Sequence, residues 1–168
     1  ILFVVIGTVL TMIVQASANM VFSSVQGGMM GALGIGLPDV PIFLAAVFKT
    51  LFEISLSFGY PYDTKQEQTY QMLLICAAVG EEAERKQAAV DANIVAQQIR
   101  MGTGICSVSF EQAKQRASKA LCSAALMGKM VQGAPIIGVY GGFRNGVLLK
   151  QIGTVAAVKY QQRMLRER

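Results

Sequence analysis

Five polar side chains stand out because they lie within otherwise apolar stretches of the sequence. They are Asp39, Lys49, Glu53, Arg144 and Asn145. An ionisable group in apolar surroundings costs free energy unless it is paired, so each of these residues is a candidate for function. Carboxylates in such a setting hold their proton more tightly and can act as general acids or bases. Asp39, Lys49 and Glu53 are therefore the candidate catalytic residues.

Each of these residues also has a structural explanation. Asp39 could be the N-cap of a helix, and Lys49 and Glu53, one helical turn apart, could form an ion pair. Arg144 and Asn145 could bind backbone carbonyls freed by the glycines around them. We expect the Lys49–Glu53 pair to face the interior close to Arg144 and Asn145, the other polar groups in a comparably apolar setting. Whether the chain is an enzyme stays open.

The composition excludes several classes of catalytic site. The sequence has no histidine, which removes Ser–His and Cys–His nucleophile systems, histidine zinc sites and imidazole proton transfer. Cys76, Cys106 and Cys122 are widely spaced and form no CxxC pair, so buried free thiols in a reducing compartment are expected. No phosphate-binding loop or nucleophile-elbow motif occurs. We therefore predict no metal site and no cofactor.

The chain is unusually apolar for its size. It has 168 residues, of which 53% are hydrophobic and 15% are charged, and its mean hydropathy is +0.46. Ordinary globular domains are about a quarter charged, so disorder is excluded and a conventional soluble enzyme is disfavoured. A membrane-associated or unusually apolar helical protein is favoured, and the length suits one domain.

Positive charge is concentrated in the second half of the sequence. Residues 94–168 contain eleven basic and two acidic side chains, a net charge of +9, whereas residues 1–59 have a net charge of −1. A basic segment joined to an apolar one suits the anionic cytoplasmic face of a membrane. Nucleic acid is not expected, because aromatic residues are not interleaved with the basic ones. The basic residues expected at the membrane surface are Lys150, Lys159, Arg163 and Arg166.

The first half of the chain contains two long apolar stretches. Residues 1–25 are long enough for a helix that is buried or inserted in a membrane. The alternative is a signal peptide with a cleavage site at residues 16–18, which lacks a visible basic start. A second helix is predicted from residue 42 to 58, ended by the Gly59–Tyr62 turn.

Two capping boxes predict further helices. Thr64 and Glu67 begin a helix predicted to run to about Met101, with a break at Gly80, and Ser109 and Gln112 begin an amphipathic helix to about residue 132. The last stretch, residues 136–168, is also helical in pattern. Close packing of helices is expected at Gly27, Gly28, Gly31, Gly138, Gly142 and Gly146. No segment alternates with a period of two, so the prediction is all-α: a compact bundle of about five to seven helices with glycine-rich connections.

Two segments together resemble the EcsC family. They are GGMMGALGIGLPDVPIFLAAVFKTLFEISLSFGYPYD and, later, APIIGVYGGFRNGVLLKQIGTVAAVKYQQRMLRER. The matching positions are Gly27, Gly28, Asp39, Lys49, Glu53, Pro135, Gly138, Gly141, Gly142 and Asn145. The chain departs from the family pattern in its Phe58–Gly59–Tyr60 turn and in a more hydrophobic first helix.

The resemblance implies a bacterial origin, a helical fold and a connection with the membrane. The family is named after a protein encoded beside an ABC transporter linked to secretion, and no biochemical activity is implied. We therefore expect one EcsC-like domain over residues 1–168, lacking its natural N-terminus, in a cytoplasmic, membrane-associated accessory protein that contacts the membrane surface or a membrane protein. The alternatives are an enzyme that uses Asp39, Glu53 and Lys49 on a lipid-like substrate, and a pore-forming or toxin-like protein. The oligomeric state is not predicted.

Overall fold

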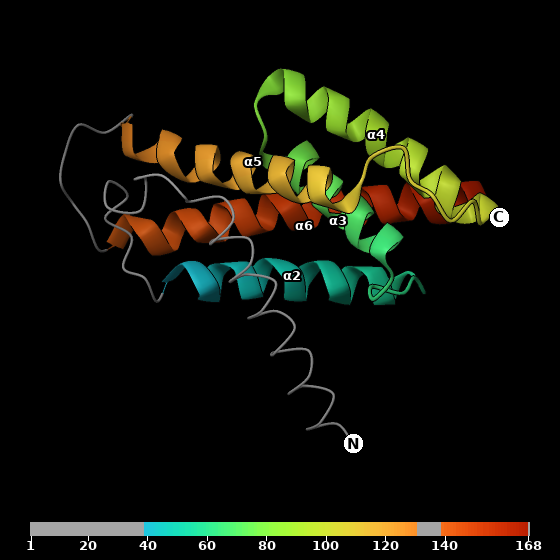
Figure 1. Cartoon of the computed structure of the whole chain (residues 1–168). Helices are drawn as coiled ribbons and strands as arrows, with labels where there is room; N and C mark the ends of the chain where they lie inside the picture. The colour runs from blue at the N-terminus through green and yellow to red at the C-terminus, as the bar shows by residue number, and fades with distance from the viewer. Residues whose placement is uncertain (1–38, 131–138, 168) are drawn as a thin grey trace.

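The computed structural model describes residues 39–130 and 139–167, which form a bundle of α-helices (Figure 1). The helices are α2 (Asp39–Ser57), α3 (Lys65–Val79), α4 (Glu82–Met101), α5 (Phe110–Met130) and α6 (Val139–Glu167). No strand occurs within those two ranges, which confirms the all-α prediction. The predicted helix over residues 1–25 and the glycine-rich segment after it lie outside the described residues. Within the described ranges, no helix has both the length and the apolar character that crossing a bilayer requires.

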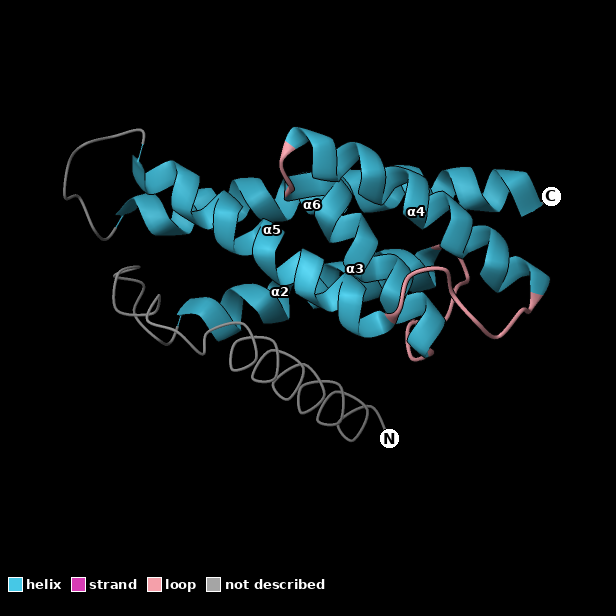
Figure 2. Ribbon diagram, turned by 45° about the horizontal axis from the view of Figure 1, so that its top comes forward, coloured by secondary structure: helices cyan, strands magenta, loops and turns pink. Residues whose placement is uncertain are grey.

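Helix α3 is the centre of the bundle. It packs against α4, α5 and α6, whereas α2 packs mainly against α6 (Figure 2). Every residue of α3 from Thr69 to Val79 is buried. The sequence explains this, because TYQMLLICAAV is apolar on nearly all sides and such a helix is stable only when other helices surround it.

Small side chains let α4 and α5 approach α3 closely. Ala88 and Ala92 of α4 and Ala113 and Ala117 of α5 are all fully buried. Their spacing of four residues puts each pair on one face of its helix, and this face is the one turned to the core. The predicted amphipathic pattern of α5 is therefore confirmed, with Leu121 one turn further along the same buried face.

The helix boundaries follow the local sequence signals. The Thr64 side chain accepts a hydrogen bond from the Glu67 backbone N–H, and Gly80 ends α3, as predicted. At the start of α5 the capping box is reciprocal: Ser109 Oγ accepts from the Gln112 N–H, and Gln112 Oε1 accepts from the Ser109 N–H. Gly102 ends α4 with a φ of +65°, a left-handed conformation that glycine adopts without strain.

Helices α2 and α6 approach each other closely at Gly153, a glycine that was not among the predicted packing positions. A Cβ atom at Gly153 would lie 3.3 Å from Thr50 Cγ2, so a larger residue would push the two helices apart. A Cβ atom at Gly146, two turns earlier, would meet nothing within 4 Å among the described residues. Gly142 lies on α6, and the other predicted packing glycines, Gly27, Gly28, Gly31 and Gly138, lie outside the described residues.

Candidate functional site

The predicted Lys49–Glu53 ion pair forms, but it lies on the surface. Lys49 Nζ is 3.2 Å from Glu53 Oε1, and the two side chains are 72% and 64% exposed. The expectation that the pair faces the interior is therefore wrong. The cause is helical periodicity: Val47, Leu51 and Ser55 carry the buried face of α2, and the charged pair lies on the opposite side.

Lys49→Met should consequently change the stability only slightly. An exposed pair at i,i+4 contributes about 0.2–0.5 kcal/mol, so we expect the free energy of unfolding to fall by no more than that. Urea unfolding followed by circular dichroism would measure the change, with Glu53→Gln as the partner variant. A loss of several kcal/mol in either variant would show that the pair is buried in solution.

Asp39 lies too far along α2 to share a site with this pair. Asp39 is the first residue of α2, fourteen residues before Glu53, which is about 21 Å along a helix axis. Arg144 and Asn145 lie near the start of α6, and their side chains, like that of Asp39, lie outside the described residues. The two predicted carboxylates therefore do not share a site, and the acid–base hypothesis has no support from the geometry.

A buried ionic network occupies the position where α3 and α6 cross. Both carboxylate oxygens of Glu67 accept hydrogen bonds from Arg163 Nη1, at 3.0 and 2.8 Å, and Tyr160 OH donates to Glu67 Oε1 at 2.7 Å. Gln71 Nε2 donates to the same hydroxyl at 3.4 Å. All four side chains are buried. Burial opposes the charged form of Arg163, but the charges and hydrogen bonds of Glu67 and Glu167 together outweigh it, so the pKa of Arg163 is raised.

The same arginine also joins the end of α6 to the turn after α2. Arg163 Nε donates to Glu167 Oε1 at 3.1 Å, and Tyr60 OH donates to Glu167 Oε2 at 2.6 Å. The guanidinium carbon of Arg163 lies 4.0 Å from the centre of the Tyr60 ring. Burial and the hydrogen bond to Glu167 raise the pKa of Tyr60 to about 12. Arg163 was expected at the membrane surface, and the structure corrects this. Its side chain is buried, and its charge pairs with Glu67 in the core.

Sequence reasoning assigned Glu67 only to a capping box. The Thr64 half of the box forms, whereas the Glu67 side chain turns to Arg163 and Tyr160 instead. One signal was available: Tyr160 and Arg163 are three residues apart on a predicted helix, so they share a face. Nothing local identified Glu67 as their partner.

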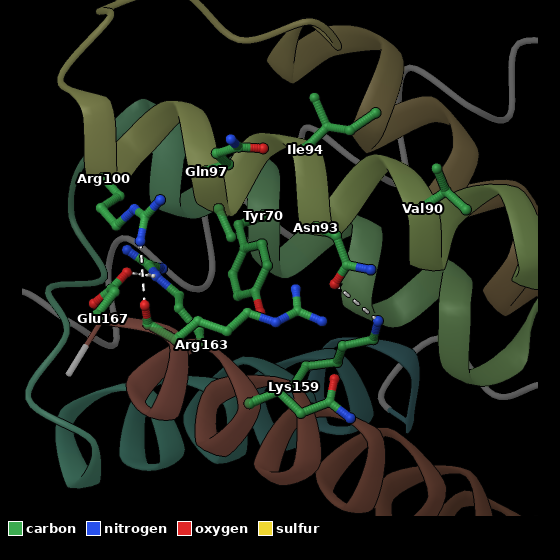
Figure 3. A pocket seen from close by; sticks show the side chains of 12 residues that line it. Tyr70, Val90, Asn93, Ile94, Gln97, Arg100, Lys159, Arg163 and Glu167 are labelled. Atoms are coloured by element: carbon green, nitrogen blue, oxygen red, sulfur yellow. Dashed lines mark hydrogen bonds and ion pairs between the residues drawn. The ribbon is translucent and has the colours of Figure 1, made fainter.

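A groove of about 450 Å³ lies next to this network, between α4 and α6. Figure 3 shows Tyr70 of α3 between the two helices, with Arg100 at one end of the groove and Val90 at the other. Four basic residues line the groove: Arg100, Lys159, Arg163 and Arg166. Glu167 is the single acidic residue of the lining. Of the predicted membrane-surface residues, Lys159 and Arg166 thus lie in the groove, and Lys150 is exposed elsewhere on α6.

Two of these four basic side chains, those of Lys159 and Arg100, are held by neutral groups. Lys159 Nζ donates to Asn93 Oδ1 at 3.1 Å and to the Ala89 carbonyl at 3.3 Å, and Arg100 Nη1 donates to the Arg166 carbonyl at 3.1 Å (Figure 3). Burial and the nearby positive charge of Arg166 lower the pKa of Lys159. This arrangement favours the binding of an anion, which would supply the charge that these cations lack.

Other polar groups of the described residues join helices or are buried. Arg116 binds Glu84 and Asp91, each at 2.7 Å, and so ties α5 to α4. Burial raises the pKa of the Cys76 thiol to about 12, which excludes a thiolate nucleophile there at neutral pH. Within residues 39–130 and 139–167, no group of acidic or cysteine side chains is arranged to hold a metal ion.

Comparison with known proteins identifies the family. Neither the curated proteins nor the solved structures gave a match. The family model of the EcsC protein family, by contrast, matches residues 12–165, which is nearly the whole chain. The chain therefore belongs to the EcsC protein family.

Proposed function

We propose that this protein associates with the surface of an anionic membrane through the side of the bundle formed by α4 and α6. The observation that carries the proposal is the α4–α6 groove, where Arg100, Lys159 and Arg166 have no carboxylate within ion-pair distance among the described residues. A basic side chain near an anionic leaflet contributes about 1 kcal/mol to binding.

Apolar side chains support the same orientation. Val90 and Ile94 line the groove and are 52% and 40% exposed, and Met101 and Leu165 are exposed near the ends of the same two helices. A surface that combines basic and exposed apolar side chains binds at the boundary between headgroups and acyl chains. We place the protein at the cytoplasmic leaflet, because anionic lipids are concentrated there. We also propose that the protein acts beside a membrane transporter or in secretion, with a membrane protein of that kind as its partner.

Binding to vesicles would test this proposal directly. We expect the protein to sediment with vesicles that contain about 30% phosphatidylglycerol and to stay in the supernatant with pure phosphatidylcholine, since the attraction is electrostatic. Raising the salt concentration from about 0.05 M to about 0.5 M should weaken binding to the vesicles at least tenfold, because salt screens the attraction between exposed charges. A protein that ignores anionic vesicles at low salt would contradict the proposal.

The same samples can exclude permeabilisation as the cause of sedimentation. Vesicles loaded with a self-quenched dye should keep their dye while the protein binds, because surface association does not open the bilayer. Rapid dye release at the protein concentration that gives half-maximal binding would favour a pore-forming role instead.

A further inference from the structure

The connection between α4 and α5, residues 102–109, holds an isoleucine out in solvent. Ile105 is 78% exposed, more than any other large hydrophobic residue of the described ranges. Gly102 and Gly104, just before it, have φ values of +65° and +71°, conformations that glycine adopts without strain. The backbone of this loop therefore turns sharply twice and leaves Ile105 outside the core.

Hydrogen bonds fix the loop in this conformation. The backbone N–H of Thr103 donates to the Gln98 carbonyl at 3.3 Å, and Thr103 Oγ1 lies 3.1 Å from the Ile105 carbonyl. On the other side of Ile105, the Ser107 N–H donates to Gln98 Oε1 at 2.8 Å. A loop that is already ordered loses little conformational entropy when a partner covers it. Ile105 is thus presented in a form that is ready for contact.

Two more exposed apolar side chains lie at the same end of the bundle. Figures 1 and 2 show α4 and α6 ending there, and Arg100 Nη1 donates to the Arg166 carbonyl at 3.1 Å. Met101 follows Arg100 and Leu165 precedes Arg166, and each is 59% exposed. Single exposed apolar residues are common on protein surfaces, whereas a group of them marks a contact surface.

The chemistry of this end fits the boundary of an anionic bilayer. Arg100 and Arg166 are exposed beside the apolar side chains, and the nearby acid Glu167 is already bound by Arg163 and Tyr60. Guanidinium groups bind lipid phosphates, while apolar side chains enter the acyl region below them. A protruding isoleucine needs a matching cavity in a protein partner, because protein interfaces are closely packed, but a fluid bilayer adapts to it.

We infer that the loop of residues 102–109 is the part of the protein that enters the bilayer, with Ile105 at its tip below the phosphates. Met101 and Leu165 follow it into the acyl region, and Arg100 and Arg166 stay at the headgroups. The inference rests on the proposed membrane association. It adds that the α4–α6 side is inserted at its loop end rather than along its whole length.

A fluorescent probe at the tip would test the insertion. The sequence contains no tryptophan, so Ile105→Trp introduces a single one. With phosphatidylglycerol vesicles its emission should shift to shorter wavelengths, and phospholipids brominated on their acyl chains should quench it. The matched control is Val147→Trp: Val147 is 50% exposed but lies about 27 Å from Leu165 along α6. Its emission should be neither shifted nor quenched.

Substitutions that leave every charge in place measure what the tip contributes to binding. Ile105→Ser should weaken binding to phosphatidylglycerol vesicles about tenfold, because it removes the apolar side chain that the acyl region buries. Ile105→Leu should bind like wild type, and so should Val147→Ser, the matched control. Circular dichroism melting curves should be alike for all the variants, since both positions are exposed.

The outcomes distinguish the insertion from membrane association itself. If Ile105→Trp sediments with the vesicles while its emission stays unquenched, the insertion is overturned and the association stands. Equal weakening by Ile105→Ser and Val147→Ser would also overturn it. Failure of wild-type protein to bind anionic vesicles would overturn both proposals. Self-association without lipid that Ile105→Ser abolishes, measured by analytical ultracentrifugation, would assign the tip to a contact between copies of the chain instead.

Discussion

Replacing Glu67 with leucine should destabilise the protein by about 3–5 kcal/mol, one of the two largest effects that we expect from a single substitution. The substitution would leave the Arg163 guanidinium buried without its carboxylate and would remove the acceptor of the Tyr160 hydroxyl. Arg163→Met should have a similar effect, because it leaves Glu67 charged and buried. Urea unfolding of each variant would measure the loss of free energy.

The double variant tests whether the two side chains act on each other. Glu67→Leu/Arg163→Met removes both charges, so it should recover much of the stability that either single substitution loses. Glu82→Leu/Lys86→Met is a suitable comparison, since that pair is also ionic but lies in solvent. There, each single variant should stay within about 0.5 kcal/mol of wild type. A similarly small change for Glu67→Leu would contradict the buried network.

Leu73→Ala should destabilise the protein by about 2–5 kcal/mol. Leu73 is fully buried in the middle of α3, where α4, α5 and α6 all pack. The substitution would remove buried methyl groups and leave a cavity. Because other helices enclose α3 on all sides, the surrounding structure cannot easily collapse to fill that cavity.

A leucine on the surface provides the control for this substitution. Leu56 of α2 is 57% exposed, so Leu56→Ala should change the free energy of unfolding by less than about 0.5 kcal/mol. Thermal and urea unfolding of the two variants under the same conditions would compare them. Equal destabilisation by both would mean that α3 is not the centre of the packed core.

The features that sequence analysis predicted correctly depend on residues close together in the chain. Thr64, Gly80 and Ser109 each act within a single helical turn, so their effects on the helix boundaries are visible without knowledge of the fold. The all-α class follows from the same local evidence. The EcsC family was identified because its two segments occur in the expected order, and the family match confirms it.

The orientation of α2 was predicted wrongly although the sequence contains the information. The helix is so apolar that burial of every side seemed plausible, and Lys49 and Glu53 were placed in the core. In a helix covered on one side by α6, two charged residues one turn apart mark the side that faces water. The pair indicated the exposed face rather than a site.

The buried network and the groove could not be predicted because their parts lie far apart in the chain. Glu67 and Arg163 are separated by 96 residues, and the groove combines residues of α4 with residues of α6. Periodicity identifies which residues share a face of one helix, but it does not say which helix that face meets. Arg163 and Lys159 therefore looked alike in the sequence, although one is neutralised in the core and the other is not.

The burial of α3 by helices that follow it has a consequence for synthesis of the protein. Translation proceeds at about 5–20 residues per second, so Glu67 leaves the ribosome roughly 5–20 seconds before Arg163, which follows it by 96 residues. During this interval the apolar surface of α3 that α6 covers is open in the nascent chain, and the carboxylate has only water as its partner. A pause or a premature stop before α6 would prolong this state and make the unfinished chain a target for chaperones and proteases.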